Sequence, residues 1–553
     1  MNPKHKRFLP LGGAFLLSLP LAACGNSVPA DANNGDTDSD PDPTPMTYAI
    51  GGTVSGTVNG SVTLQNNGTD SVEVGDGSFE FPTQLEDGSD YAVTVAQHPE
   101  RQLCSVSNAN GTVSGANVDN IEVVCRSWRT ATSIENGDSG DGAYNPQIAV
   151  DGQGNAIAVW EQDDDSNAAN NQLNIWANTY TAGSGWGTAE PIESDSSGDA
   201  RKPQIAFARD GHAIAVWHQD QGDDTDLDVR ANTYTTGSGW DEAKTIDNQD
   251  GGDAEDPQIA ADGQGNAIAV WEQDDGTNYD IAATTYTAAD GWGTPKTVDN
   301  STSGELVFSP EVAVYSGGNA IAAWEQEDDA NYSIYAKTYS ADSGTWESSA
   351  TLLENGDAGD ADNPQIAVDG AGNALAVWYQ DDGTNDSIYA NRYSADSGTW
   401  DSSAALLENG DAGDADDPQI SVDGAGNALA VWHQDDGTND SIYANRYSAD
   451  SGTWDSSAAL LENGDAGDAD DPQISVDGAG NAIVVWEQDD GTTDNVRAIS
   501  YTASNGWSTA ATLESSDDGA SDVQVAVSSA GNAVAVWEQY NGMHPDLYAN
   551  RFE

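Results

Sequence analysis

Positive charge is scarce in this sequence: 17 Lys and Arg residues stand against 93 Asp and Glu, for a formal net charge of −76 over 553 residues. So acidic a chain repels phosphate backbones, which excludes a nucleic-acid partner, and it lacks the basic patch needed to bind anionic lipids. Cysteine and histidine are scarce as well, with three Cys and six His. These low numbers argue against a His/Cys metal centre or a cysteine nucleophile.

Long apolar runs are equally rare, and the run at residues 8–23 is too short to span a bilayer as a mature helix. It follows Lys4, Lys6 and Arg7, the pattern of an export signal. The run ends in LAAC, which resembles the lipobox of bacterial lipoproteins and implies cleavage of residues 1–23 and lipidation of Cys24. Gly25 follows the cysteine, so the resemblance implies a lipid anchor in the outer membrane, on its periplasmic face or at the cell surface. An ordinary signal peptide is the alternative.

The segment after the signal divides into a tether and a small β domain. Residues 24–46 are rich in Asp, Asn and Pro with almost nothing to bury, which predicts an extended tether. Residues 47–126 alternate apolar residues with Gly/Asn/Asp turns, which predicts a small antiparallel sandwich that resembles Ig-like or prealbumin-like modules. With Cys24 used by the lipid, Cys104 and Cys125 remain for a disulfide in an oxidising compartment.

Residues 127–553 repeat one motif eight times. Its first Trp recurs at intervals of 51 to 57 residues, and each unit holds four strand candidates and no ten-residue stretch of helical periodicity. Four short strands per unit predict a β-propeller, so the fold class is all-β with eight blades. These first tryptophans are Trp160, Trp217, Trp271, Trp324, Trp378, Trp432, Trp486 and Trp537.

The last repeat ends after its third strand, and the missing piece lies before the first repeat. Trp128 in SWRTATSIENGD matches the fourth-strand segment TWDSSAALLENGD of later repeats. The N-terminal strand is therefore expected to complete the last blade and close the ring, which removes exposed edges. A seven-bladed ring with one spare unit is the alternative.

Several repeated residues have expected structural roles. Gly154 and its seven equivalents, mostly followed by Asn, predict a hairpin turn between the first two strands. A Gln that follows each first Trp by two positions is expected to satisfy backbone groups, and the Trp side chains to pack between blades. Exposed Trp platforms for sugar rings are the alternative. The segment SADSGTW at three blades resembles the Asp-box of sialidase-like propellers, which implies a structural turn.

Acidic residues gather in two loop types that emerge on the same face of the predicted ring. Carboxylates separated by Gly and Asn suit Ca²⁺, although no run has EF-hand spacing. A haloadapted or merely solvated surface is the alternative. The candidate calcium ligands are Asp381, Asp382, Asp386, Asp411, Asp414 and Asp416.

Blade two concentrates the cations and two histidines, which makes it the candidate for chemistry. A His base with Arg neutralising a uronate would suit a polysaccharide lyase. However, His212 and His218 fall at opposite ends of one strand, about 20 Å apart if it is regular. The candidate catalytic residues are His212, His218, Arg209 and Arg230.

We therefore expect a surface-displayed, non-catalytic binding or scaffold lipoprotein that engages a protein or glycan ligand, with or without calcium. A propeller polysaccharide lyase or glycoside hydrolase centred on blade two is the second interpretation, and a structural surface-coat protein is the third.

Overall fold

The computed structural model describes residues 45–553 apart from 59, 100–101, 136–141, 164–171, 195–197, 221–225, 248–251, 275, 301–304, 329–330, 355–358, 409–412, 463–466, 504 and 515–517. Across these residues the chain forms strands and no helix, so the all-β prediction is confirmed. The described part accordingly contains no helix long and apolar enough to cross a bilayer.

The small N-terminal domain consists of two four-stranded sheets and a two-stranded ribbon. Its strands are β1 (Thr47–Tyr48), β2 (Ile50–Ser55), β3 (Val62–Asn66), β4 (Asp70–Val74), β5 (Gly77–Glu80), β6 (Leu85–Glu86), β7 (Asp90–Gln97), β8 (Leu103–Ser107), β9 (Asn110–Thr112) and β10 (Val118–Arg126). One sheet has the order β5-β2-β10-β8 and the other β4-β3-β7-β9. Alternating residues of both sheets, such as Ile50, Leu64 and Ile121, are fully buried between them.

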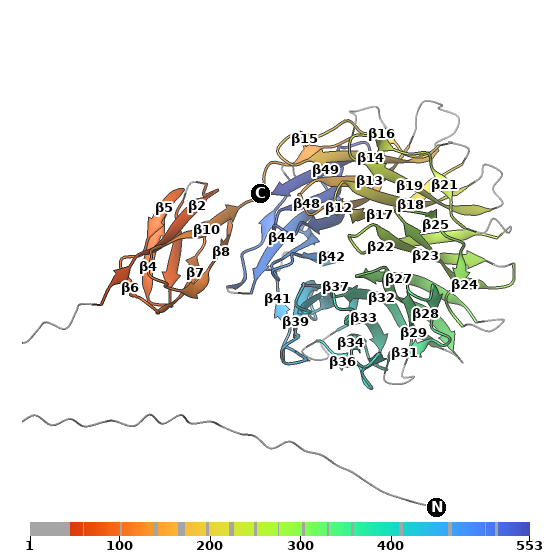
Figure 1. Cartoon of the computed structure of the whole chain (residues 1–553). Helices are drawn as coiled ribbons and strands as arrows, with labels where there is room; N and C mark the ends of the chain where they lie inside the picture. The colour runs from red at the N-terminus through yellow and green to blue at the C-terminus, as the bar shows by residue number, and fades with distance from the viewer. Residues whose placement is uncertain are drawn as a thin grey trace, which may run out of the picture. The chain divides into compact units, whose positions relative to one another are not determined.

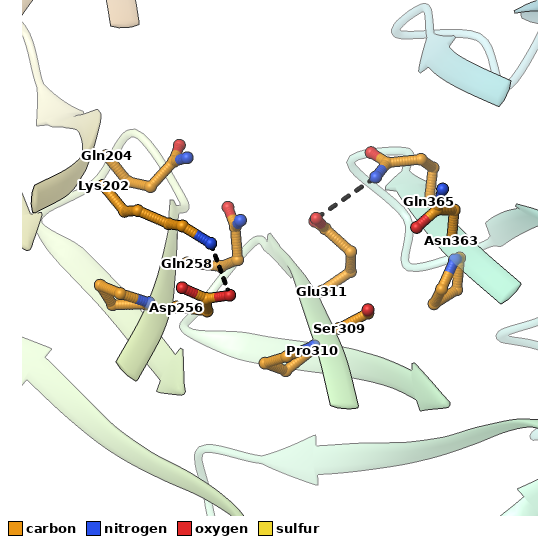
Figure 2. A pocket seen from close by; sticks show the side chains of 11 residues that line it. Lys202, Gln204, Asp256, Gln258, Ser309, Pro310, Glu311, Asn363 and Gln365 are labelled. Carbon is orange, nitrogen blue, oxygen red and sulfur yellow. Dashed lines mark hydrogen bonds and ion pairs between the residues drawn. The ribbon is translucent and has the colours of Figure 1, made fainter. Parts of the chain in front are cut away.

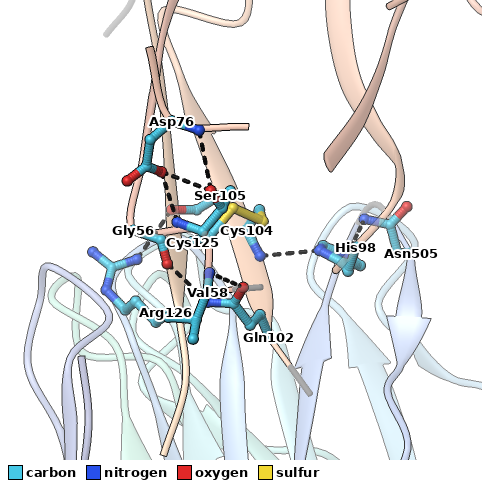
Figure 3. Close-up of a disulfide and its surroundings, with 11 residues drawn as sticks. Gly56, Val58, Asp76, His98, Gln102, Cys104, Ser105, Cys125, Arg126 and Asn505 are labelled. Carbon is cyan, nitrogen blue, oxygen red and sulfur yellow. Dashed lines mark hydrogen bonds between the residues drawn. A yellow bond between two sulfur atoms is a disulfide. The ribbon is translucent and has the colours of Figure 1, made fainter. Parts of the chain in front are cut away.

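The predicted disulfide is present between Cys104 and Cys125 (Figure 3). The two residues are paired neighbours on the antiparallel strands β8 and β10, so the bond crosses two strands of one sheet. The disulfide therefore reinforces the edge of one sheet. In an antibody domain, by contrast, the disulfide ties the two sheets together.

Eight further antiparallel sheets follow, which we call repeat sheets 1 to 8 (Figure 1). Sheets 1 to 4 comprise β12 (Ala143–Val150), β13 (Ala156–Asp163), β14 (Leu173–Thr181), β15 (Gly185–Trp186) and β16 (Glu190–Pro191); β17 (Ala200–Arg209), β18 (His212–Asp220), β19 (Leu227–Thr235), β20 (Gly239–Trp240) and β21 (Lys244–Thr245); β22 (Ala254–Ala261), β23 (Asn266–Asp274), β24 (Tyr279–Thr287), β25 (Gly291–Trp292) and β26 (Lys296–Thr297); and β27 (Val307–Tyr315), β28 (Asn319–Asp328), β29 (Asn331–Ser340), β30 (Thr345–Trp346) and β31 (Thr351–Leu352).

Sheets 5 to 8 repeat this plan. They comprise β32 (Ala361–Val368), β33 (Ala374–Asp381), β34 (Asp386–Ser394), β35 (Thr399–Trp400) and β36 (Ala405–Leu406); β37 (Ala415–Val422), β38 (Ala428–Asp435), β39 (Asp440–Ser448), β40 (Thr453–Trp454) and β41 (Ala459–Leu460); β42 (Ala469–Val476), β43 (Ala482–Asp489), β44 (Asp494–Thr502), β45 (Gly506–Trp507) and β46 (Ala511–Thr512); and β11 (Thr132–Ser133), β47 (Ala520–Val527), β48 (Ala533–Tyr540) and β49 (Pro545–Phe552).

The first strands of neighbouring sheets contact one another in cyclic order, from β12 with β17 to β42 with β47, and β47 contacts β12 (Figure 1). The first strands therefore surround the centre of a closed ring, and the fold is propeller-like. The fourth strand differs from the prediction: in sheets 1 to 7 it is split into two two-residue pieces that both pair with the third strand.

The eighth sheet is assembled from both ends of the repeat region. Strand β11 pairs with β49 in the order β11-β49-β48-β47, and Trp128 forms a further bridge to Phe552. The Ile134 N–H donates to the Leu547 carbonyl at 3.0 Å. The sequence expectation that the N-terminal strand joins the last unit is thus what the structure shows.

Tryptophan and glycine fix the geometry of each sheet. All eight first Trp side chains have no exposed surface, so the sugar-platform alternative is wrong for them. Each indole N–H donates to the Gln two positions later, as Trp160 does to Gln162 at 2.9 Å. The Gln amide therefore satisfies an indole, and in several sheets backbone carbonyls as well. Gly154 has a φ of 81°, and its seven equivalents are also positive, as the predicted hairpin turns require.

Candidate functional site

A polar cavity of about 220 Å³ lies against the first strands of repeat sheets 2 to 5 (Figure 2). We call it the central pocket, because first strands surround the centre of the ring. Each of the four strands contributes residues from one tripeptide around a proline. The lining residues are Lys202, Gln204, Asp256, Pro257, Gln258, Ser309, Pro310, Glu311, Asn363, Pro364 and Gln365.

A backbone bulge in each first strand presents these side chains to the pocket. The residue before the proline has a left-handed backbone, with φ of 51° at Lys202, 49° at Asp256 and 51° at Ser309. The sheet register shifts at the same place, for example between Arg201 and Gln204. A bulge re-aims side chains, and a left-handed non-glycine residue persists only where its surroundings hold it.

Carboxylates of the preceding sheet hold three of the bulges in place by accepting a backbone N–H. The Glu161 carboxylate accepts the Lys202 N–H at 2.8 Å, and the Glu272 carboxylate accepts the Ser309 N–H at 2.9 Å. Glu325 accepts from Asn363 in the same way at 2.8 Å. In each case the acceptor is the residue after the first Trp, so this position links neighbouring sheets and fixes the bulge that lines the pocket.

The central pocket lies where the repeat is broken. At the position after the proline, seven first strands carry Gln and the fourth carries Glu311. At the bulge, four strands carry Asp and two carry Asn, whereas sheets 2 and 4 carry Lys202 and Ser309. Lys202, Ser309 and Glu311, the three residues that differ from the repeat, all line this one cavity. Catalysis or selective binding requires such asymmetry, which the nearly identical sheets 5 and 6 do not offer.

The two acids of the pocket are in different environments (Figure 2). The Asp256 carboxylate accepts from the Lys202 ammonium at 2.8 Å, so its charge is paired. The Glu311 carboxyl accepts from the Gln365 amide at 3.3 Å. Burial raises the pKa of Glu311 to about 8, and the hydrogen bond from Gln365 opposes this only in part. Burial therefore favours the neutral form of the Glu311 carboxyl.

His218 lies beside this pocket, but in a structural role. Its Nδ1 accepts the Asp256 N–H at 3.3 Å, which makes it the sheet 2 counterpart of Glu161 and Glu272. Burial lowers its pKa to about 4. A base with so low a pKa is poorly matched to proton abstraction near pH 7.

The other three candidate catalytic residues lie elsewhere. His212 is buried at the far end of β18, where Nδ1 contacts the Thr235 hydroxyl at 3.0 Å and Nε2 the Tyr286 hydroxyl at 3.1 Å. Arg209 pairs with His212 in the sheet register; burial lowers the pKa of the His212 imidazole, and the charge of Arg209 adds to this effect. Arg230 lies on β19 and pairs in the sheet register with Trp217 of β18. As their sequence spacing predicted, His212 and His218 lie at opposite ends of β18 and do not form one site.

Three of the candidate calcium ligands accept backbone N–H groups of nearby loops. Asp381 accepts the Gly383 N–H at 2.7 Å, Asp382 accepts from Thr384 at 2.9 Å, and Asp414 accepts the Asp386 N–H at 3.2 Å. Asp416 lies 3.9 Å from His433, and Asp411 lies outside the described residues. No group of three or more acidic, His or Cys side chains among the described residues is arranged to hold a metal ion.

Sequence reasoning missed the central pocket, although one signal for it was present. The motif reads PQ in six repeats and VQ in the eighth, but SPE in the fourth, which singles out Glu311. The bulge itself had no such signal, because a left-handed residue before a proline is not what local preference predicts.

No family model matches the chain, and no curated protein matches it either. Several solved structures resemble its fold. The polysaccharide lyase Uly1 is 8% identical with a TM-score of 0.44, over 74% of this chain and 90% of that one. A Penicillium chrysogenum α-L-arabinanase is 13% identical with a TM-score of 0.36, over 55% and 94%. A leech intramolecular trans-sialidase is 14% identical with a TM-score of 0.34, over 72% and 82%. Likenesses this weak carry no argument about activity.

Proposed function

We propose that this protein is an outer-membrane lipoprotein, anchored through Cys24, that binds a glycan in the central pocket. In this proposal the eight repeat sheets are the blades of an eight-bladed propeller, and residues 47–126 form an Ig-like sandwich. The observation that carries the proposal is the coincidence of the cavity with the departures from the repeat at Lys202, Ser309 and Glu311.

The lining chemistry favours a polyhydroxylated ligand. Amide groups of Gln204, Gln258 and Gln365 offer both donors and acceptors, as sugar hydroxyls require. A few polar groups of this kind, converging in a concave site, fix the orientation of a small ligand. None of the described residues that line the pocket is aromatic, so hydrogen bonds and not ring stacking would supply its selectivity.

Charge favours one of the two enzymatic alternatives over the other. A polysaccharide lyase must bind a uronate, but the Lys202 ammonium in the pocket is paired with Asp256 and the chain carries a formal charge of −76. An anionic polymer is therefore repelled from this site. A glycoside hydrolase is the better second candidate, because the protonated Glu311 carboxyl is suited to donate a proton to a leaving group.

The test uses the mature chain with Cys24→Ser, incubated with neutral, uronate-containing and amino polysaccharides, with Ca²⁺ or with EDTA. We expect retention on a neutral or amino polymer. Retention that EDTA abolishes would support the calcium prediction, and released oligosaccharides would favour the hydrolase. Retention on uronates alone would contradict the charge argument.

Matched variants locate the site. Gln258→Ala removes a lining amide, whereas Gln473→Ala removes the equivalent amide of sheet 7, which does not line the pocket. Loss of one or two hydrogen bonds corresponds to a several-fold weaker retention. Equal effects of the two variants, or none, would place binding elsewhere and leave a protein ligand or a surface-coat role as the explanation.

A further inference from the structure

The ring of residues after the proline provides an internal comparison for Glu311. Gln204 and Glu311 occupy the same register position, opposite Val216 and Ala323 of their second strands. Glu and Gln have nearly the same shape, so the fold accommodates either side chain at this position. The carboxyl of Glu311 is therefore not needed for packing, and its distinguishing property is that it can carry a negative charge.

The acidic residues of the ring of bulge positions favour a cation over an anion. Asp256 lines the same cavity, and the bulge positions that continue the ring beyond it carry Asp417, Asp471 and Asp522. The Lys202 ammonium opposes them, but it lies 2.8 Å from the Asp256 carboxylate, which offsets its charge. Because Lys202 is paired, the acidic residues at the other bulge positions outweigh its charge, and the local field attracts cations.

Glu311 has no cationic partner of its own among the described residues. Its hydrogen bond comes from the neutral Gln365 amide at 3.3 Å, and burial disfavours the charged carboxylate. A ligand ammonium group placed beside it would reverse that preference, since an opposite charge favours the ionised form. Binding would then convert the carboxyl to a carboxylate, and the proton would pass to the solvent.

We propose that the central pocket selects glycans that carry free amino groups, with Glu311 as the residue that recognises the ammonium. This inference rests on the proposed glycan-binding function and narrows its substrate class. Lys202 weakens the selection, because its pairing with Asp256 offsets a negative charge that would otherwise attract the same ammonium.

The experiment compares two oligosaccharides that differ only in this group: an oligomer of glucosamine and its fully N-acetylated counterpart. Binding to the mature Cys24→Ser chain is measured by isothermal titration calorimetry at pH 6.0, in two buffers of different ionisation enthalpy. We expect the amino oligomer to bind at least tenfold more tightly, and its binding to release close to one proton for each site.

Three variants assign the effect. Glu311→Gln should bring the affinity ratio of the two oligomers to about one and abolish proton release. Lys202→Asn, which installs the residue found at the bulge of sheet 5, should increase the ratio. Asp396→Asn removes the same charge from an exposed turn and should leave the ratio unchanged.

The outcomes separate the two proposals. Tighter or equal binding of the N-acetylated oligomer would overturn the amino-group inference while glycan binding stands. A preference that survives in Glu311→Gln would also overturn it, because general attraction of a cation to an acidic surface would then be the cause. Failure of both oligomers and of every polysaccharide in the panel would overturn the glycan-binding function itself.

Discussion

Replacement of Ile134 by alanine tests whether the N-terminal strand is an integral part of the ring. Ile134 follows β11, is 2% exposed, and packs with residues of sheets 1 and 8 that include Trp160 and Leu547. Truncation of a buried Ile to Ala costs about 2–5 kcal/mol through lost transfer energy and the cavity left behind. Ile134→Val, which removes one methylene, should cost about 0.5–1.5 kcal/mol.

Leu513 supplies the matched control. It occupies the equivalent position after β46 of sheet 7 and is also 2% exposed, but β46 follows the other strands of its own sheet in the chain, whereas β11 precedes all of the ring. If β11 is fully docked, Ile134→Ala and Leu513→Ala should lower the free energy of unfolding by similar amounts. Urea unfolding followed by tryptophan fluorescence measures both. A large loss for Leu513→Ala with less than about 0.5 kcal/mol for Ile134→Ala would refute the closure.

Three further predictions concern other parts of the chain. Lys337→Met should lower the free energy of unfolding by about 1–3 kcal/mol, because the buried ammonium donates to the Val298 and Asp299 carbonyls. Lys337→Asn should leave it nearly unchanged, since Asn178 makes the equivalent contact in sheet 1; urea unfolding measures both variants. Burial raises the pKa of Glu272 to about 7 and of Glu487 to about 8, so the folded state holds more protons than the unfolded state above about pH 4.5. Stability should therefore fall as the pH rises from 5.5 to 8.5, and a higher urea midpoint at pH 8.5 would contradict this. Cys24→Ser should move the protein from the membrane fraction to the soluble fraction, and persistence in the membrane would refute the anchor.

The sequence predicted the parts of the fold that depend on repetition. The interval between Trp160 and its seven equivalents, with a turn glycine before each, was enough to predict four-stranded units. The match between Trp128 and the later fourth strands predicted that the chain ends share a sheet. The last repeat lacks a fourth strand, and the segment around Trp128 is a fourth strand with no repeat of its own, so the one completes the other. The structure joins the two chain ends in one sheet as predicted, but it splits the fourth strand of sheets 1 to 7 into two short pieces.

The site was not predictable in the same way, because it depends on what the ring brings together. Lys202 and Asp256 are 54 residues apart in sequence and 2.8 Å apart through their side chains. Their approach requires first strands at the centre and a left-handed bulge in each, which no local pattern encodes. The position of His218 depends on the same ring, because its counterparts, such as Glu161, accept a backbone N–H from the next sheet, which sequence alone does not show.

The placement of β11 in the last sheet has a mechanical consequence. A pull on the N-terminal side of the chain reaches β11 before any other strand of the ring, and β11 is held to β49 by the pairing of Thr132 and Ser133, the Trp128 bridge and the Ile134 hydrogen bond. Tension on a membrane tether would thus load the one seam at which the ring can open without breaking a covalent connection between sheets. The strength of these contacts with β49 would set the force at which the tethered ring opens.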